Sequence, residues 1–240
     1  MRLDLSRMDS ADGKNIGTQT ISSNADQISW QCHVVENKHE YLNPYFSVIA
    51  VEPFSRYTLL IPYSHRPDQK ELEDDLIHRW GNEMLHHMMD CGAVLDSDLD
   101  IVANQFRSED KNISWYRNTD LSVNGHVADA EQWIRDYLDQ YGMDNLDDDN
   151  AVNLGIHINR QVKRAKNAKN ASGKRERFIP VPRFVDDGLF RFAKGMCECQ
   201  FEHTPEGNYP KPWGDEPKVI TVPQELPDNV VSLADYSKRR

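Results

Sequence analysis

The apolar residues of this chain are concentrated in residues 45–63. Runs of β-branched and aromatic residues lie on both sides of the polar segment 52–56, which predicts two strands joined by a tight turn. Because strand residues alternate between the two faces of a sheet, we expect one face to carry Val48, Ala50, Leu59 and Ile61, and the other to carry Phe46, Ile49, Val51, Tyr57 and Leu60. Apolar residues on both faces indicate that helices cover both sides of this hairpin.

The pattern after the hairpin has a helical period. Apolar residues recur every four positions from Leu72 to Met88, which predicts a helix over 68–91. Similar stripes predict helices over 96–107, over 126–141 and from residue 150 onward. Residues 28–36 and 113–116 are predicted strands, and 178–203 is apolar enough for a docked strand or short helix. The predicted fold class is α+β (or α/β), a small central β-sheet with helices packed on it and flexible termini.

The composition of the two ends predicts the domain organisation. Residues 1–27 are rich in Ser, Asp and Asn, which predicts a flexible N-terminal segment. From residue 204 onward, six prolines and many charges predict a Pro-rich extended tail over 204–240. We therefore expect a single α+β domain over 28–203, with a basic loop near 165–177.

The net charge of the chain bears on its solubility and on the partners that it can bind. It has 240 residues, with 39 acidic and 28 basic residues and a formal net charge of -11. This balance favours solubility and repels nucleic-acid backbones at long range. No signal peptide and no apolar run of about 18 residues is visible, and the four cysteines do not resemble a disulfide framework. We expect a soluble, cytoplasmic protein that does not associate with a membrane.

Residues 160–177 are the exception to the acidic balance, because they hold eight basic residues and one acid. Such a segment can bind nucleic-acid phosphate or an acidic protein. Aromatic residues are missing before Phe178, which argues against base stacking. A solvated helix end followed by a flexible loop explains the same pattern. The predicted binding residues are Arg160, Lys163, Arg164, Lys166, Lys169, Lys174, Arg175 and Arg177.

Two groups of residues have spacings that resemble metal sites. Cys197, Cys199 and His203 offer three ligands, which Cys32 or His33 could complete, although one residue between the cysteines is tight for zinc. The pairs Glu36-x-x-His39 and Glu83-x-x-His86 have the spacing of carboxylate-bridged bundles. Only the second pair lies on a predicted helix, whose stripe is apolar. We expect no cofactor and no metal, and leave open whether Cys197, Cys199 and His203 bind one.

Standard catalytic motifs are missing. The sequence contains no nucleophile elbow, phosphate-binding loop or dinucleotide fingerprint. The alternating acids Asp96, Asp98 and Asp100 and the run 147–149 are typical of solvated turns. A small polar centre could form from the segment Asn118 to Asp129, including Asp120 and His126, together with Arg160. Helix caps and turns explain the same residues.

Several segments in order resemble an uncharacterised bacterial family that is known only as a domain of unknown function. The resemblance spans residues 28–165 and comprises a Trp-led strand (30–33), the apolar hairpin (46–62), an Asn-rich segment ending in Ser-Val-x-Gly (118–125), Asp129 and an Ile-Asn-Arg helix end (158–164). The turn 52–56 lacks the Asn-Asp pair common in that family. The resemblance implies a compact α/β or α+β domain and does not assign an activity to it.

Two hypotheses of function follow. The first is a non-catalytic interaction or regulatory module that binds a protein partner or nucleoprotein complex through segregated acidic and basic surfaces. Such a module fits an accessory protein of a mobile element, and nucleic acid is a partner for its basic segment. The alternative is a hydrolase or nuclease-like enzyme with a polar centre near Asn118, Asp129 and Arg160. We prefer the first, because charge segregation is marked and catalytic motifs are missing.

Overall fold

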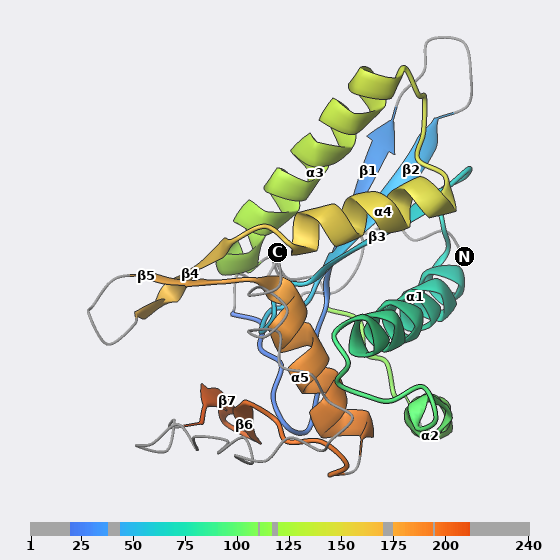
Figure 1. The fold of residues 1–240 in the computed structure, drawn as a ribbon. Helices are drawn as coiled ribbons and strands as arrows, with labels where there is room; N and C mark the ends of the chain where they lie inside the picture. Colours follow the sequence, from blue (N-terminus) through green and yellow to red (C-terminus); the bar gives the residue numbers. More distant parts are fainter. Residues whose placement is uncertain are drawn as a thin grey trace, which may run out of the picture. The chain divides into compact units, whose positions relative to one another are not determined.

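A computed structural model describes residues 20–37, 44–109, 111–116, 120–169, 175–193 and 195–211. Its central sheet has three antiparallel strands in the order β1-β2-β3, which are Gln31–Asn37, Tyr45–Val51 and Thr58–Tyr63 (Figure 1). In the central strand β2, Val48 is paired with Val34 on one side and Ile61 on the other. The predicted hairpin is therefore confirmed, and the predicted strand before it forms one edge of the sheet.

A buried carboxylate closes the turn of the hairpin. Glu52 accepts hydrogen bonds from the backbone N–H groups of Phe54 (2.9 Å) and Ser55 (2.5 Å). The hydroxyls of Ser55 and Ser23 also donate to it. Arg56 completes the turn with a left-handed backbone, at a φ of 59°. Burial raises the pKa of Glu52, and nearby Asp187 acts in the same direction.

The first face of the sheet carries α1 (Gln69–Asp90), α2 (Leu99–Ser108) and α5 (Pro180–Phe192) (Figure 1). Helix α1 begins with a capping box, in which Asp68 and Glu71 bind each other's backbone N–H groups. The core on this face includes Leu59, Leu72 and Met84, which are all fully buried. The helix predicted over 68–91 is thus confirmed.

The second face carries α3 (Leu121–Tyr141) and α4 (Asp148–Asn159). The α3 helix begins five residues earlier than predicted, because the Asp120 carboxylate accepts the N–H of Ser122 and caps it.

The buried Asn159 side chain joins the end of α4 to β3. Its amide oxygen accepts the N–H of Thr58 and its amide nitrogen donates to the carbonyl of Thr58, both at 2.8 Å.

Two buried clusters, one on each face of the sheet, confirm the α+β class and the prediction that helices cover both faces. The predicted faces need one correction. Tyr57 and Phe46 pack in the same cluster as Val48 and Leu59, not with Ile49. The reason is the period of two, since residues 46, 48 and 50 point the same way, as do 57, 59 and 61.

The structure also corrects local predictions. Residues 113–116 form no strand. Part of the predicted basic loop pairs as two strands, β4 (Lys163–Lys169) and β5 (Arg175–Phe178). The apolar segment after it forms α5, followed by the hairpin β6 (Phe201–Thr204) and β7 (Gly207–Pro210). In the described part of the chain, the helices are all too short or too polar to cross a membrane.

Both predicted terminal segments have described residues that bind the domain. The N–H of Ile21 donates to Asp120 (2.8 Å), and the N–H of Ala25 donates to the carbonyl of Thr204 (3.0 Å). Residues 204–210, at the start of the predicted tail, belong to the β6–β7 hairpin. Residues 1–19 and 212–240 lie outside the described residues, and the domain division stays a prediction.

Candidate functional site

Strands β4 and β5 form a two-stranded antiparallel unit between α4 and α5, here called the basic ribbon (Figure 1). Its register places Lys163 opposite Phe178, Arg164 opposite Arg177 and, after an irregularity, Lys169 opposite Arg175. Two of its three register pairs therefore join two basic residues. Like charges directly opposite each other destabilise a strand pair, so this register is one that a bound anion would stabilise.

The pair Arg164 and Arg177 is the best-described part of the ribbon. Both side chains are exposed. Within the described ranges, neither guanidinium has a carboxylate at ion-pair distance. Arginine presents a planar fork of donors that matches a phosphate group. This pair is thus a site at which two guanidinium groups can contact one anionic backbone.

Lys163 differs from the other predicted binding residues because it is buried, with 5% of its surface exposed. Burial lowers the pKa of its ammonium group, and the nearby Asp129 carboxylate opposes that effect. Beside it at the base of the ribbon, the Arg183 guanidinium lies 3.7 Å from the centre of the Phe178 ring and pairs with Glu176. These contacts anchor the ribbon and leave Lys163 unavailable to a partner.

Arg160 lies at the C-terminal cap of α4, where its guanidinium is 3.3 Å from the Asp90 carboxylate. Both side chains are more than half exposed, and exposed ion pairs of this kind contribute about 0–1 kcal/mol. Arg160 therefore remains accessible to a partner. Lys174 and the side chains of Lys166, Lys169 and Arg175 lie outside the described residues.

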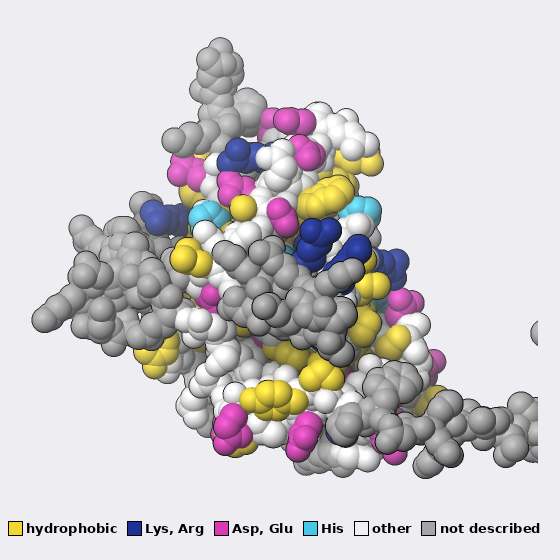
Figure 2. Space-filling view, turned by 90° about the vertical axis from the view of Figure 1, so that its left-hand side faces the viewer, with side chains coloured by type: hydrophobic (Ala, Val, Ile, Leu, Met, Phe, Trp, Pro, Cys, Tyr) yellow, Lys and Arg dark blue, Asp and Glu magenta, His cyan; other side chains and the backbone are white. Residues whose placement is uncertain are grey.

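The face that Figure 2 presents is not uniformly acidic. Several Lys and Arg side chains lie together to the right of the grey centre of this view, and others lie apart from them at the upper left, with Asp and Glu side chains nearby. A chain with a formal net charge of -11 thus also presents basic side chains on this face.

The predicted polar centre is only partly assembled. Ser122, His126 and Asp129 share one face of α3, and the guanidinium of Arg56 donates to the Ser122 hydroxyl at 3.1 Å. Burial lowers the pKa of His126 to about 4, with Arg56 and Lys163 adding to the effect. Asp120 is committed to the α3 cap, Arg160 is paired with Asp90 instead, and Asn118 lies outside the described residues.

The cysteines and histidine of the candidate zinc site contact different groups. The Cys197 thiol donates to the carbonyl of Ala93 (3.0 Å) and the Cys199 thiol to that of Asp186 (3.7 Å). The His203 ring lies between the Asp186 and Asn208 side chains. No cluster of His, Cys, Asp or Glu suited to a metal occurs among the described residues. Asp186 instead ties the β6–β7 hairpin to α5.

The other proposed metal and acidic groups have local roles or lie apart. His39 is outside the described residues. Glu36 lies on strand β1, where two residues three positions apart point to opposite faces of the sheet. Asp147 caps α4 by accepting the N–H of Asn150 at 2.8 Å. Asp98 occupies the cap position of α2.

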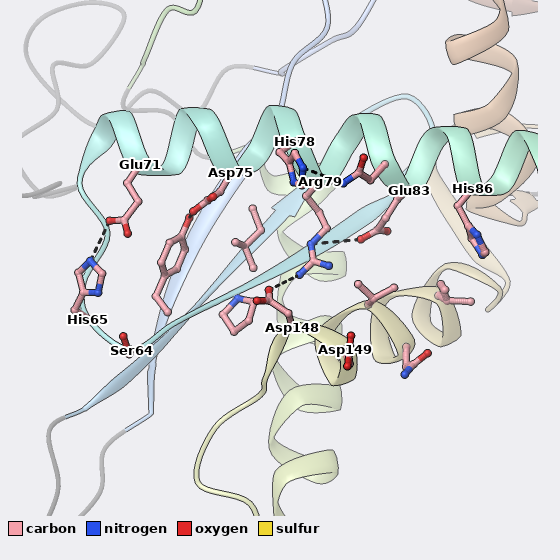
Figure 3. A pocket seen from close by; sticks show the side chains of 17 residues that line it. Ser64, His65, Glu71, Asp75, His78, Arg79, Glu83, His86, Asp148 and Asp149 are labelled. Carbon is pink, nitrogen blue, oxygen red and sulfur yellow. Dashed lines mark hydrogen bonds and ion pairs between the residues drawn. The ribbon is translucent and has the colours of Figure 1, made fainter. Parts of the chain in front are cut away.

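A groove between α1 and α4 was not predicted. It has a volume of about 770 Å³ and is lined by residues of both helices and of the end of β3 (Figure 3). Its α1 wall presents Glu71, Asp75, Arg79 and Glu83, which recur every four residues. A sequence signal therefore existed, as a polar stripe with helical period beside the apolar one, but such a stripe is usually a solvated face.

Glu83 is the buried member of this stripe. One carboxylate oxygen, Oε2, accepts a hydrogen bond from the Tyr57 hydroxyl at 2.7 Å. The same hydroxyl lies 2.7 Å from Nε2 of His87. Burial raises the pKa of Glu83 to about 7, against the opposing effects of Tyr57 and Arg79, and burial lowers the pKa of His87 to about 4. The groove thus has a carboxyl group in its wall that titrates near neutral pH.

Comparison with known proteins gives no relative, because no family model, curated protein or solved structure matches this chain. The resemblance to the uncharacterised bacterial family stays a prediction. The function must therefore be argued from the residues and their arrangement.

Proposed function

We propose that the protein is a non-catalytic interaction module whose basic ribbon contacts the phosphate backbone of a nucleic acid, in a nucleoprotein partner. The observation that carries the proposal is the register of the ribbon, which sets Arg164 directly opposite Arg177 on an exposed strand pair. A phosphate backbone offers the anions that would relieve this repulsion.

The shape of the ribbon supports a nucleic acid over an acidic protein. The major groove of DNA admits a two-stranded β-ribbon. The ring of Phe178 is covered by Arg183 and is therefore not free to stack on a base. With no free aromatic ring among its described side chains, the ribbon favours contacts of its guanidinium groups to phosphates, which position a protein without reading sequence. We infer binding that depends on charge more than on nucleotide sequence, in the cytoplasm.

The acidic remainder of the chain limits the contact to the ribbon. A formal net charge of -11 repels phosphate at long range. Holding the arginines on a separate strand pair lets them approach an anion while the acidic helices stay away from it. The acidic surfaces are then available to the protein part of the same complex.

The alternative, a hydrolase or nuclease-like enzyme, has weaker support. It would rely on His126 and Asp129, because Arg160 pairs with Asp90 and Asp120 caps a helix. A His126 pKa of about 4 makes this residue a weak base at neutral pH. No specific observation favours this function over binding.

The proposal is tested with the full chain and fluorescently labelled duplex DNA. The double variant R164A/R177A should bind about tenfold more weakly than the unmodified protein. The matched control R66A/R107A removes the same charge from exposed positions outside the ribbon and should change affinity by less than about twofold. Equal losses in both variants would show that only net charge matters. Tighter binding to polyglutamate than to DNA would contradict a nucleic-acid partner and indicate an acidic protein.

A further inference from the structure

The groove between α1 and α4 contains a carboxylate oxygen without a hydrogen bond. Oε1 of Glu83 is buried and has no hydrogen-bond partner in the described part of the chain, and the whole residue is 5% exposed. The nearest cation is the Nε atom of Arg79, at 3.8 Å, which is too far for a hydrogen bond. Buried carboxylate oxygens are rarely left in this state, so the atom marks a place for a donor.

The charge around this oxygen selects the kind of donor. Five carboxylates line the groove together with a single guanidinium, that of Arg79. The Arg79 guanidinium is shared between Glu83 and Asp148, because its Nη2 atom lies 3.2 Å from the Asp148 carboxylate. Figure 3 shows Glu71, Asp75 and Glu83 extending from one side of α1 into the groove, with Glu71 bonded to His65. The groove thus attracts a cation that can donate hydrogen bonds.

The shape of the groove points to an elongated ligand. Glu71, Asp75 and Glu83 lie along α1 at intervals of one and two turns, so the row extends over about 18 Å. Apolar side chains of Ile61, Val152 and Ile156 also line the groove. A ligand with several ammonium groups joined by methylene chains matches this combination of acidic and apolar lining. A compact metal ion does not, and the described residues form no metal cluster.

We propose that this groove binds a linear aliphatic polyamine, with Glu83 Oε1 accepting a hydrogen bond from one of its ammonium groups. The Tyr57 hydroxyl donates a hydrogen bond to Oε2, the other carboxylate oxygen of Glu83, and so fixes the orientation of this side chain. Asp75 is positioned in the same way by the Tyr63 hydroxyl, at 2.8 Å. Asp149 on α4 lines the opposite wall. The site does not depend on the basic ribbon, so either assignment can fail alone.

Binding of a polyamine should depend on the ionisation of Glu83. The charged or titratable groups around this carboxyl are Arg79, His86 and His87 on α1, Tyr57 before β3, and Asp148 and Asp149 on α4. His87, with a pKa of about 4, stays neutral above pH 6. A polyamine favours the carboxylate form of Glu83, so affinity should rise between pH 6 and pH 8, where this group loses its proton.

The test is calorimetric titration of the full chain with spermidine. E83Q preserves the size of the side chain and should weaken binding about tenfold or more. D74N removes an exposed carboxylate on α1 that does not line the groove, and should leave affinity unchanged. The unmodified protein should bind more tightly at pH 8 than at pH 6. E83Q should lose most of that difference.

Three outcomes would overturn the proposal. The first is no binding of spermidine at millimolar concentration, and the second is equal affinity of E83Q and the unmodified protein. The third is tighter binding of a tri-lysine peptide than of spermidine, sensitive to E83Q, which would assign the groove to a basic peptide instead of a free polyamine. Circular dichroism of each variant shows that a loss of binding is not a loss of fold.

Discussion

Replacing Glu83 by glutamine should change how stability depends on pH. The carboxyl has a pKa of about 7 in the folded protein, against an ordinary value of 4.5. Because the folded-state pKa is the higher of the two, folding favours the protonated form. The stability that this form provides is complete below pH 4.5 and is lost as the pH rises through 7.

The magnitude follows from the two pKa values. One unit of pKa difference corresponds to about 1.36 kcal/mol, so ionised Glu83 destabilises the fold by about 3 kcal/mol above neutral pH. Glutamine does not titrate and keeps an oxygen that can accept the Tyr57 hydroxyl. E83Q should therefore be close to the unmodified protein at low pH and more stable than it at high pH.

The assay is urea unfolding of both proteins, followed by tryptophan fluorescence at about pH 5 and about pH 8. The free energy of unfolding of E83Q, minus that of the unmodified protein, should increase by about 2–3 kcal/mol between the two. D74N, at an exposed position on the same helix, should show a difference that is flat with pH. A flat difference for E83Q as well would refute the reasoning, because it would mean that burial does not raise this pKa.

Two further predictions concern packing and the strand β3. A Cβ atom at Gly81 would lie 2.6 Å from the rigid Phe106 ring, so G81A should lower the free energy of unfolding by about 1–3 kcal/mol in urea denaturation. At Gly125 an added Cβ atom would meet no atom within 4 Å, so G125A should raise the free energy of unfolding by up to about 1 kcal/mol. Asn159 bonds both backbone groups of Thr58, so N159A should cost about 2–4 kcal/mol and speed hydrogen exchange at the Thr58 amide; unchanged exchange there would contradict this role.

The sequence was most informative where residues alternate or recur regularly. The hairpin and α1 were predicted because the period of each element is visible in its apolar residues. The start of α3 was missed because the polar residues before Gly125 resemble a turn, and only the position of Asp120 shows that they belong to the helix. A single capping residue decides that boundary, and many polar residues can serve as caps.

The candidate sites were harder to predict because they depend on contacts between distant segments. Strand β4 is rich in lysine and alanine, which have low strand propensity, so its pairing with β5 was not visible. Lys163 is buried, and the Asp129 carboxylate that acts on it belongs to α3, a separate segment of the chain. Glu83 belongs to a polar stripe like that of an exposed helix face, and only α4 turns that face into a groove. Charge segregation is visible in a sequence, whereas burial of a charge is not.

The salt dependence of DNA binding tests the central claim most directly. Each phosphate contact contributes about -0.9 to the slope of log K against log salt concentration on duplex DNA. Removing Arg164 and Arg177 should therefore make the slope less steep by about 2, while R66A/R107A should keep the slope of the unmodified protein. A slope for R164A/R177A equal to that of the unmodified protein would contradict the assignment of the basic ribbon as the surface that binds nucleic acid.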